Sequence, residues 1–212
     1  MFNEEKFKET ISRLESLDKS FSLKHIPRKD WTPEMVKGKV FLWQIPRTTA
    51  QFIYSQVILK KPSLVLELGT SGGYSTLWIA KAVNDSIGES NASIHTIEFS
   101  EDRFNIAKEN FENVQTENII QHQGKIEPVI KSWSDEGFGK IDFLFIDADR
   151  PAYTYHFRII EPNLNKGALI IADNILDKPE KAQEFVDYMM NNSDFYSTVF
   201  DFDNGLLFAI KK

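Results

Sequence analysis

The sequence predicts a doubly wound α/β fold, in which a mostly parallel β-sheet has helices on both faces and ends in an antiparallel hairpin. Short, nearly continuous apolar segments alternate with amphipathic segments, and a turn sequence near the C-terminus joins two apolar segments directly. Strands that are apolar on both faces are typical of parallel sheets covered on each side by helices. No linker rich in Gly, Ser or Pro divides the 212 residues, so we expect one domain over residues 1–212.

Seven apolar segments are short enough and rich enough in β-branched and aromatic residues to be strands. They cover residues 63–68, 93–98, 118–122, 141–146, 168–172, 196–202 and 206–210. Helices are expected at residues 3–20, 48–59 and 74–83, after the capping residue Ser100, and at 126–133, 153–160 and 180–190. The sequence Asp203-Asn-Gly205 predicts the turn of the closing hairpin.

Overall composition narrows the classes of function. The net charge of −6 at pH 7 argues against a broad nucleic-acid-binding face. The absence of cysteine excludes disulfides, thiolate nucleophiles and zinc–thiolate sites, and it suits a reducing compartment. The first residues lack the layout of a signal peptide, and no apolar run reaches about 18 residues, the length that a membrane span needs. We therefore expect a cytoplasmic protein that binds neither nucleic acid nor membrane.

The first predicted strand leads into a glycine-rich loop, Glu67-Leu-Gly-Thr-Ser-Gly-Gly-Tyr-Ser75, and then into a helix. Ligands of doubly wound sheets bind beyond the carboxyl ends of the strands. Glycines let a ligand approach the backbone closely, and free N–H groups at the start of the following helix can bind an anion. A dinucleotide fold would need Gly-x-Gly-x-x-Gly, which is absent here, so NAD is disfavoured.

The same loop also spells Gly-x-Ser-x-Gly, the pattern of a serine hydrolase, which would make Ser71 a nucleophile. That fold needs an acid and then a histidine further along the chain. The last histidine is His156, and none follows Asp173. A serine hydrolase is therefore the weaker interpretation.

Glu98 ends the second predicted strand, one strand after the glycine loop. A carboxylate at this place can accept hydrogen bonds from both ribose hydroxyls of a nucleoside that lies over the sheet. By itself, Glu98 is better explained as a solvated acid at a strand end. Together with the glycine loop, it favours a cofactor that contains a nucleoside.

Five segments between Thr49 and Lys212 carry a family resemblance. They are the glycine loop, Thr96-Ile-Glu98, Phe143-Leu-Phe-Ile-Asp-Ala-Asp149, Gly167-Ala-Leu-Ile-Ile-Ala-Asp-Asn174 and Asp203-Asn-Gly-Leu-Leu-Phe-Ala-Ile-Lys211. In this order they resemble class I S-adenosylmethionine-dependent methyltransferases, in particular the catechol and caffeoyl-CoA O-methyltransferase-like enzymes that act on small molecules. The resemblance implies a Rossmann-like, seven-stranded sheet with the last strand inserted antiparallel beside the fifth. It also implies methyl transfer from S-adenosylmethionine to a small-molecule acceptor, most simply to a hydroxyl.

Carried over to this sequence, the resemblance places the methionine end of the cofactor at the glycine loop. Glu67 and Gly69 would hold the amino and carboxylate groups. Ser71, Tyr74 and Ser75 would line the same loop.

The ribose and adenine would lie over the next strands. Glu98 would bind the ribose, and Phe99 would lie against the adenine. Gly124 and the backbone at Ile126 would contact the adenine from the other side. The acidic contact that the family has there is missing, because Lys125 takes its place.

The resemblance also implies a divalent-cation site. In the metal-dependent branch, two aspartates and an asparagine bind a cation that lowers the pKa of the acceptor hydroxyl, and the matching residues here are Asp147, Asp173 and Asn174. Oxygen ligands of this kind suit Mg²⁺, Ca²⁺ or Mn²⁺. Asp147 would also have a catalytic role near the sulfonium and the acceptor. Alternatively, Asp147 and Asp173 have only structural roles, at the ends of strands and as helix caps.

Arg150 stands where that branch has a lysine able to act as general base. Arginine stays protonated in proteins, so a catalytic Arg150 would stabilise a phenolate or a substrate carboxylate, or it would simply pair with Asp149. His156 is an alternative base, because imidazole titrates in the right range, although a packed or surface role explains it more simply. Arg150 also favours a second hypothesis, a methyltransferase-fold protein that binds the cofactor with little or no turnover.

Residues 1–47 are expected to form a helix and an irregular aromatic segment ahead of a cofactor-binding core over residues 48–212. The segment from Trp31 to Trp43 would close the acceptor pocket as a lid, or it would pack against the sheet edge or a dimer partner. By resemblance, a homodimer would form through the N-terminal helices. Ile175–Glu180 is shorter than in the family, so the acceptor pocket should be more open or closed by another element.

Overall fold

The computed structural model describes residues 1–19, 32, 35, 40–136 and 139–212. The strands are β1 (Leu64–Leu68), β2 (Ser93–Glu98), β3 (Ile119–Gln123), β4 (Ile141–Ile146), β5 (Leu164–Ala172), β6 (Phe195–Phe200) and β7 (Leu206–Lys211). The α-helices are α1 (Glu4–Lys19), α3 (Arg47–Lys60), α4 (Tyr74–Ser86), α5 (Glu101–Val114), α6 (Ile126–Glu136), α7 (Tyr153–Ile160) and α8 (Gln183–Asn191). Every predicted element is present. The largest shift is at β5, which begins at Leu164, and α8 begins only after a 3₁₀ turn at Pro179–Lys181.

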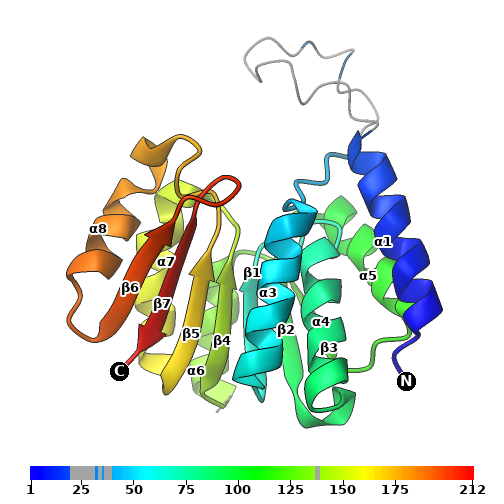
Figure 1. Ribbon diagram of the computed structural model, residues 1–212, viewed down its shortest axis with the longest axis horizontal. Coiled ribbons are helices and arrows are strands. Elements are labelled where there is room, and N and C mark those ends of the chain that lie inside the picture. The colour runs from blue at the N-terminus through cyan, green and yellow to red at the C-terminus, as the bar shows by residue number, and fades with distance from the viewer. Residues whose placement is uncertain (20–31, 33–34, 36–39, 137–138) are drawn as a thin grey trace.

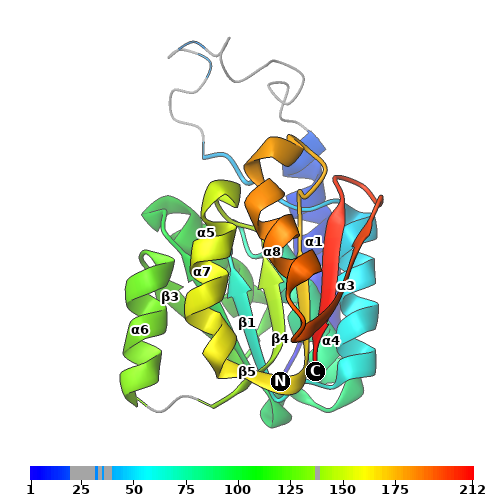
Figure 2. The same cartoon turned by 90° about the vertical axis from the view of Figure 1, so that its left-hand side faces the viewer.

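The strands form one sheet in the order β3-β2-β1-β4-β5-β7-β6 (Figure 1). Strands β1 to β5 run parallel to one another, whereas β7 lies antiparallel between β5 and β6. The side view shows helices on both faces of the sheet (Figure 2). The predicted doubly wound sheet is confirmed, and so is the insertion of the last strand beside the fifth.

Apolar side chains form two cores, one on each face of the sheet. Along β4, Phe143 and Phe145 join the core beneath α1, α3, α4 and α5. The alternate residues Leu144 and Ile146 join the core beneath α6, α7 and α8. Since successive side chains of a strand point to opposite faces, burial on both faces explains why the sequence of β4 is almost continuously apolar.

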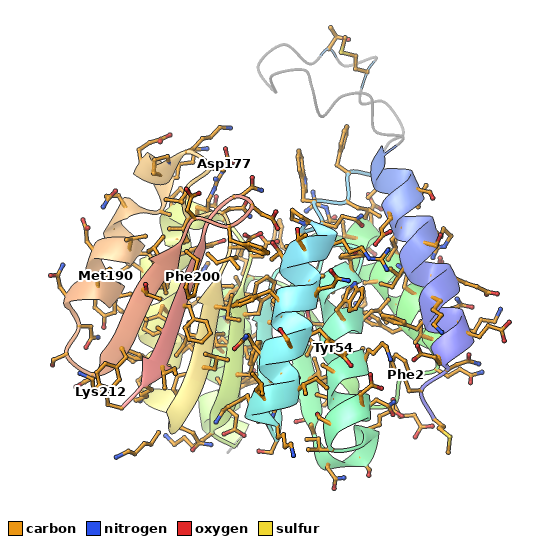
Figure 3. All side chains as sticks on the ribbon, in the orientation of Figure 1. Phe2, Tyr54, Asp177, Met190, Phe200 and Lys212 are labelled. Carbon is orange, nitrogen blue, oxygen red and sulfur yellow. The ribbon has the colours of Figure 1, made fainter. Side chains whose placement is uncertain are left out.

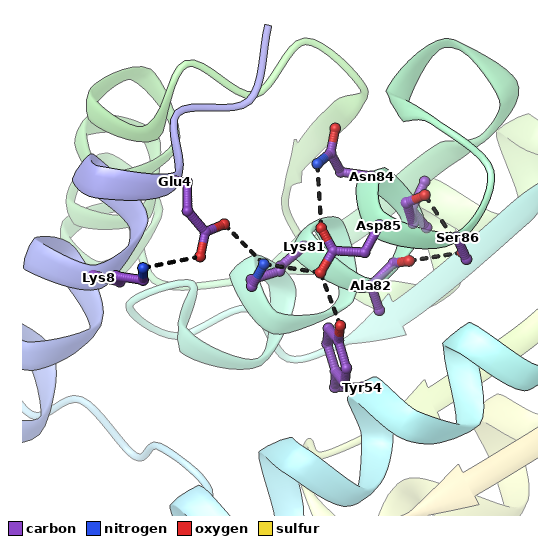
Figure 4. Close-up of polar contacts among 9 residues, drawn as sticks. Glu4, Lys8, Tyr54, Lys81, Ala82, Asn84, Asp85 and Ser86 are labelled. Carbon is purple, nitrogen blue, oxygen red and sulfur yellow. Dashed lines mark hydrogen bonds and ion pairs between the residues drawn. The ribbon is translucent and has the colours of Figure 1, made fainter.

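A polar network fixes α1 to the helices beside it (Figure 4). Lys81 of α4 forms ion pairs of 2.8 Å with Glu4 of α1 and with Asp85 of its own helix. Asp85 also accepts a hydrogen bond of 2.8 Å from the Tyr54 hydroxyl of α3. The Lys81 ammonium lies 5.7 Å from the centre of the Phe7 ring. One lysine thus connects the N-terminal helix to the core.

Most of the segment predicted to be a lid, including Trp31, lies outside the described residues. At its described end, the rings of Phe41 and Trp43 stack with their centres 6.0 Å apart. Within the described parts of the chain, no helix has the length and apolar character needed to cross a membrane.

Candidate functional site

The predicted site residues follow the carboxyl ends of the parallel strands, which share one edge of the sheet. β1 and β4 are neighbours in the sheet. After β1 the chain adds β2 on one side of this pair, and after β4 it adds β5 on the other side. Doubly wound folds bind ligands at such a switch point. Asp177, from the loop after β5, lies at this end of the molecule, and Lys212, after the antiparallel β7, lies at the other (Figure 3).

Gly69 brings the loop after β1 against the loop after β4. Its φ is +99°, and a Cβ at this position would lie only 2.0 Å from the carbonyl oxygen of Asp147. The Asp147 N–H donates to the carbonyl of Leu68 at 2.9 Å. Any side chain at position 69 would separate the two loops, so the close approach requires glycine.

Glu67 is a fully buried carboxyl group beneath the glycine loop. Its Oε2 accepts hydrogen bonds from the hydroxyls of Thr76 (2.5 Å) and Thr96 (2.6 Å), while its Oε1 has no hydrogen-bond partner in the described part of the chain. Burial raises the pKa of Glu67, and the hydroxyls of Ser75, Thr76 and Thr96 oppose that shift. A buried carboxyl group with one unpaired oxygen is suited to receive a cationic donor such as an ammonium group.

Glu98 is held by backbone N–H groups at the end of β2. The N–H of Ser71 donates to its Oε2 and that of Ser100 to its Oε1, both at 2.8 Å. Arg103 of α5 lies 3.7 Å from Oε1. Because each carboxylate oxygen has a second lone pair, Glu98 can still accept hydrogen bonds from the hydroxyls of a ligand.

Ser71 is held as part of the loop rather than as a nucleophile. Its hydroxyl oxygen accepts the backbone N–H of Trp43 at 3.1 Å. No histidine in the described ranges hydrogen-bonds to this hydroxyl, and His95 instead pairs with His122 at 2.9 Å. The geometry therefore offers no support for a serine hydrolase.

Tyr74 and Ser75 begin α4 directly after the loop. Ser75 is buried beside Glu67. The Tyr74 hydroxyl donates to Glu15 of α1 at 2.7 Å, and burial together with this hydrogen bond raises the Tyr74 pKa. Tyr74 thus ties the start of α4 to the N-terminal helix.

Phe99, Gly124 and Ile126 follow the ends of β2 and β3. Phe99 is 69% exposed, so its ring is available for stacking. The Gly124 N–H donates to the carbonyl of Glu98 at 2.9 Å, and Ile126 begins α6. Since β2 separates β3 from β1, Gly124 and Ile126 lie on the opposite side of Glu98 from the glycine loop, and Phe99 directly follows Glu98.

Asp147, Asp173 and Asn174 converge at the ends of β4 and β5. The Asn174 side-chain NH₂ donates to Asp147 Oδ1 at 3.0 Å and to Asp173 Oδ2 at 3.1 Å. Burial raises the pKa of both acids, that of Asp173 to about 6, and the charge of Asp173 raises that of Asp147 further. No group of three or more His, Asp or Glu that could hold a metal occurs in the described residues, so a cation here would bind two carboxylates and one amide.

Arg150 points toward the loop after β5 and does not pair with Asp149. Its Nη1 donates to the Asp177 carboxylate at 3.0 Å and to the Asn174 carbonyl at 3.4 Å, and it also contacts the carbonyl of Asp177. Arg150 therefore holds the loop that carries Asn174.

Helix α7 contributes Tyr153 to the site, whereas His156 stays apart. The Tyr153 hydroxyl accepts the N–H of Ala148 at 3.2 Å and donates to the Asp173 carbonyl at 3.3 Å, so it joins the two loops. His156 Nδ1 is buried without a hydrogen-bond partner among the described residues, and burial lowers the His156 pKa. The geometry does not support His156 as a base.

Residues 16–194, which include all of these site residues, match the model of a protein family described as O-methyltransferase. The chain belongs to the O-methyltransferase family.

Several curated proteins are similar to this chain over part of their length. A catechol O-methyltransferase of Niastella koreensis is 34% identical over 113 residues, which cover 53% of this chain and 49% of that protein. A caffeoyl-CoA O-methyltransferase of Petunia hybrida is 30% identical over 141 residues, which cover 63% of this chain and 56% of that protein. The chain thus spans about half the length of the curated relatives that it matches.

Solved structures share the fold. An O-methyltransferase from Bacillus cereus, solved in complex with SAH, aligns with a TM-score of 0.74 at 22% identity, covering 96% of this chain and 91% of that one. The O-methyltransferase TomG from Streptomyces achromogenes, solved with SAM, aligns with a TM-score of 0.71 at 20% identity, covering 80% and 82%. At these identities, the likeness establishes the fold.

Two residues that the sequence does not single out, Asn204 and Arg103, hydrogen-bond to segments of the candidate site. The Asn204 NH₂ donates to Asn174 Oδ1 at 3.3 Å, whereas the Asp203-Asn-Gly205 sequence predicts a hairpin turn and no contact with the site. Arg103 donates to the carbonyl of Phe41 at 2.9 Å, so it connects the aromatic segment to Glu98. The residues around Arg103 look like an ordinary amphipathic helix, so no sequence signal singled it out.

Proposed function

We propose that this protein is an S-adenosylmethionine-dependent O-methyltransferase, which transfers a methyl group to a hydroxyl of a small-molecule acceptor. The observation that carries the proposal is the 2.8 Å hydrogen bond from Ser71 to Glu98. It unites a glycine loop at a helix start with a carboxylate able to bind a ribose. Membership of the O-methyltransferase family supports the reaction, and the names of the catechol and caffeoyl-CoA relatives support a small hydroxylated acceptor.

In this proposal, the cofactor lies along the carboxyl edge of the sheet. The unpaired Oε1 of Glu67 receives the methionine ammonium group, and the loop at Gly69 lets the backbone approach the methionine carboxylate. Glu98 accepts the ribose hydroxyls. Phe99, beside Gly124 and Ile126, packs against the adenine.

The donor set of Asp147, Asp173 and Asn174 fits a divalent cation such as Mg²⁺. The Asn174 NH₂ now lies between the two carboxylates, and rotation of this amide would present its oxygen to a cation instead. Asp173 Oδ1 is buried and has no hydrogen-bond partner in the described chain, so its lone pairs can serve as cation ligands. When bound, the cation would lower the pKa of the acceptor hydroxyl.

The reaction itself is a direct displacement. The bond between the methyl carbon and sulfur breaks while a bond to the acceptor oxygen forms. The bonding electrons go to sulfur, which leaves as the neutral thioether of S-adenosylhomocysteine, and the hydroxyl proton passes to water. The protein's contribution is to align donor and acceptor, and such alignment can lower a barrier by about 7–11 kcal/mol. Asp147 lies at the junction of the two loops, where it would face both the sulfonium and the acceptor. Arg150 is engaged with Asp177, so we assign it to positioning the loop.

A second candidate function is cofactor binding with little or no turnover. The observation that favours it is Arg150 itself, because a guanidinium group does not accept the acceptor's proton. Methyl transfer to any acceptor in a screen of hydroxylated small molecules would exclude this candidate.

The decisive experiment combines binding and turnover. Isothermal titration with S-adenosylhomocysteine should show binding by the wild type and a large loss of affinity in Glu98→Ala. An acceptor screen with methyl-labelled S-adenosylmethionine, run in parallel with chelator and with added Mg²⁺, tests the chemistry. Absence of binding by the wild type would refute the proposal, and activity that ignores the chelator would refute the cation site alone.

The assignment of residues 1–212 to one domain, the lid role of residues 31–43, the homodimer and the cytoplasmic location stay predictions. For the lid, the supporting contact is the Trp43 N–H on the Ser71 hydroxyl, which places the described end of that segment beside the cofactor loop.

A further inference from the structure

The peptide group between Gly72 and Gly73, at the end of the glycine loop, is held from both sides. The N–H of Gly73 donates to the carbonyl of Thr70 at 2.8 Å. On the other side, the side-chain NH₂ of Asn110 donates to the carbonyl of Gly72 at 2.7 Å. Both polar atoms of this peptide group are therefore satisfied, and its plane is fixed.

Asn110 lies on α5, and its side chain is completely buried. Its Oδ1 accepts a hydrogen bond from Arg13 of α1. A guanidinium group can only donate, so the oxygen of the amide must face Arg13 and its NH₂ must face Gly72. Arg13 thus determines which way Asn110 points.

The neighbouring contacts leave little room for the loop to adjust. A Cβ on Gly73, whose φ is +82°, would lie 2.5 Å from the ring of Phe111, the residue after Asn110. The next residue, Tyr74, donates its hydroxyl to Glu15 of α1. Helices α1 and α5 therefore support the end of the loop from outside the cofactor site.

We propose that Asn110, oriented by Arg13, is a positioning residue for the cofactor-binding loop. It fixes the Gly72–Gly73 peptide group, and through it the free N–H groups at the start of α4 that would face the cofactor. The inference rests on the proposed function, since it presumes that this loop binds S-adenosylmethionine. It assigns a role in cofactor affinity to the N-terminal helix, which reaches the glycine loop through Asn110 and Tyr74.

The substitution Asn110→Asp separates positioning from packing. A carboxylate has nearly the same shape and keeps a partner for Arg13, but it has no proton to donate to the Gly72 carbonyl. If Asn110 only joins α5 to α1, this variant should bind S-adenosylhomocysteine like the wild type. If it positions the loop, affinity should fall about tenfold or more, because a buried carbonyl loses its donor and faces a negative charge.

Asn113→Asp is the matched control. Asn113 lies one turn further along α5 and donates to the Thr10 hydroxyl of α1 at 2.7 Å, so it joins the same two helices without touching the loop. Its affinity for S-adenosylhomocysteine should stay within about twofold of the wild type. Arg13→Met, a change at an exposed position, covers the case in which Asn110→Asp fails to fold. Arg13→Met should also weaken binding of S-adenosylhomocysteine. A double variant with both substitutions should bind no more weakly than Asn110→Asp alone.

The measurements are isothermal titration with S-adenosylhomocysteine, thermal unfolding, and the split between KM and kcat. We expect Asn110→Asp to raise the KM for S-adenosylmethionine while kcat changes little. If the wild type binds and both Asn110→Asp and Arg13→Met bind equally well, this inference is overturned and the proposed function stands. If the wild type does not bind, both are overturned.

Discussion

Gly69 lies so close to Asp147 that the loops after β1 and β4 meet through their backbones. A Cβ on Gly69 would lie 2.0 Å from the Asp147 carbonyl oxygen, well inside van der Waals contact. The two residues directly follow the neighbouring strands β1 and β4, so the same contact determines where the Asp147 carboxyl lies relative to the glycine loop.

Gly69→Ala should therefore be one of the most damaging single substitutions in the chain. The added methyl group would collide with the backbone of Asp147, which cannot move aside as the end of a flexible side chain could. In addition, φ at this position is +99°. We expect the free energy of unfolding to fall by about 3 kcal/mol or more, together with loss of S-adenosylhomocysteine binding. Gly167→Ala is the control, because Gly167 has a φ of +76° but no atom within 4 Å of its Cβ position. It should lose only about 1–2 kcal/mol. Equal losses in urea unfolding would contradict the steric explanation.

Burial of Asp173 should make stability fall as pH rises. Burial raises the pKa of Asp173 from 3.8 to about 6, so the folded state holds this proton more tightly than the unfolded state. The penalty of ionising Asp173 is absent below about pH 4 and complete above about pH 6. Without divalent cations, we expect Asp173→Asn to stabilise the protein at pH 8 by an amount on the order of 1–3 kcal/mol, with little effect at pH 4.

Urea unfolding of Asp173→Asn and wild type at pH 4, 6 and 8, with chelator present, tests this expectation. Asp149→Asn is the control, because Asp149 is exposed at the same edge of the sheet. A difference between Asp173→Asn and the wild type that does not vary with pH would show that ionisation of Asp173 is not its cause. The stabilised variant should also lose methyl transfer if Asp173 helps to bind the cation.

The parts of the site that the sequence predicted are those fixed by strand order. Parallel strands bring their carboxyl ends to one edge, so the approach of Glu98 to the glycine loop follows from position alone. The direction of Tyr74 did not follow, because its hydroxyl points to Glu15, 59 positions earlier in the chain. From the sequence, Asp149 is the neighbour that Arg150 could pair with, whereas its partner in the structure is Asp177, 27 positions away. Contacts between loops that are distant in the sequence depend on how the helices and strands pack, and the local pattern of residues does not determine this packing.

Arg150→Met should lower activity through the loop after β5. It removes the hydrogen bonds to Asp177 and to the Asn174 carbonyl, so Asn174 loses one of its supports. We expect kcat/KM to fall about tenfold, while the pH at half-maximal activity stays unchanged, because Arg150 exchanges no proton. Asp177→Asn, which keeps a side-chain acceptor for Arg150, should be much milder. A displaced pH profile in Arg150→Met would instead give Arg150 a direct part in proton transfer.

Lys81→Met should weaken the attachment of α1 to the core, and the resulting loss of stability should depend on pH. Burial disfavours the Lys81 charge, but the contacts with Asp85 and Glu4 outweigh it and raise the Lys81 pKa. Burial likewise opposes ionisation of Asp85, yet its contacts with Lys81 and Tyr54 lower its pKa below 3.8. The stabilisation that Asp85 contributes is thus present above about pH 4 and is lost as pH falls through its lowered pKa.

Because the Lys81 side chain is only 17% exposed, Lys81→Met should lower the free energy of unfolding by about 1–2 kcal/mol at pH 7 and by less at pH 3. Lys131→Met removes a more exposed pair with Glu127, in which the lysine is 64% exposed, and should change stability by at most about 0.5 kcal/mol. Urea unfolding at both pH values distinguishes these outcomes, and equal effects of the two substitutions would contradict a structural role for the Lys81 network.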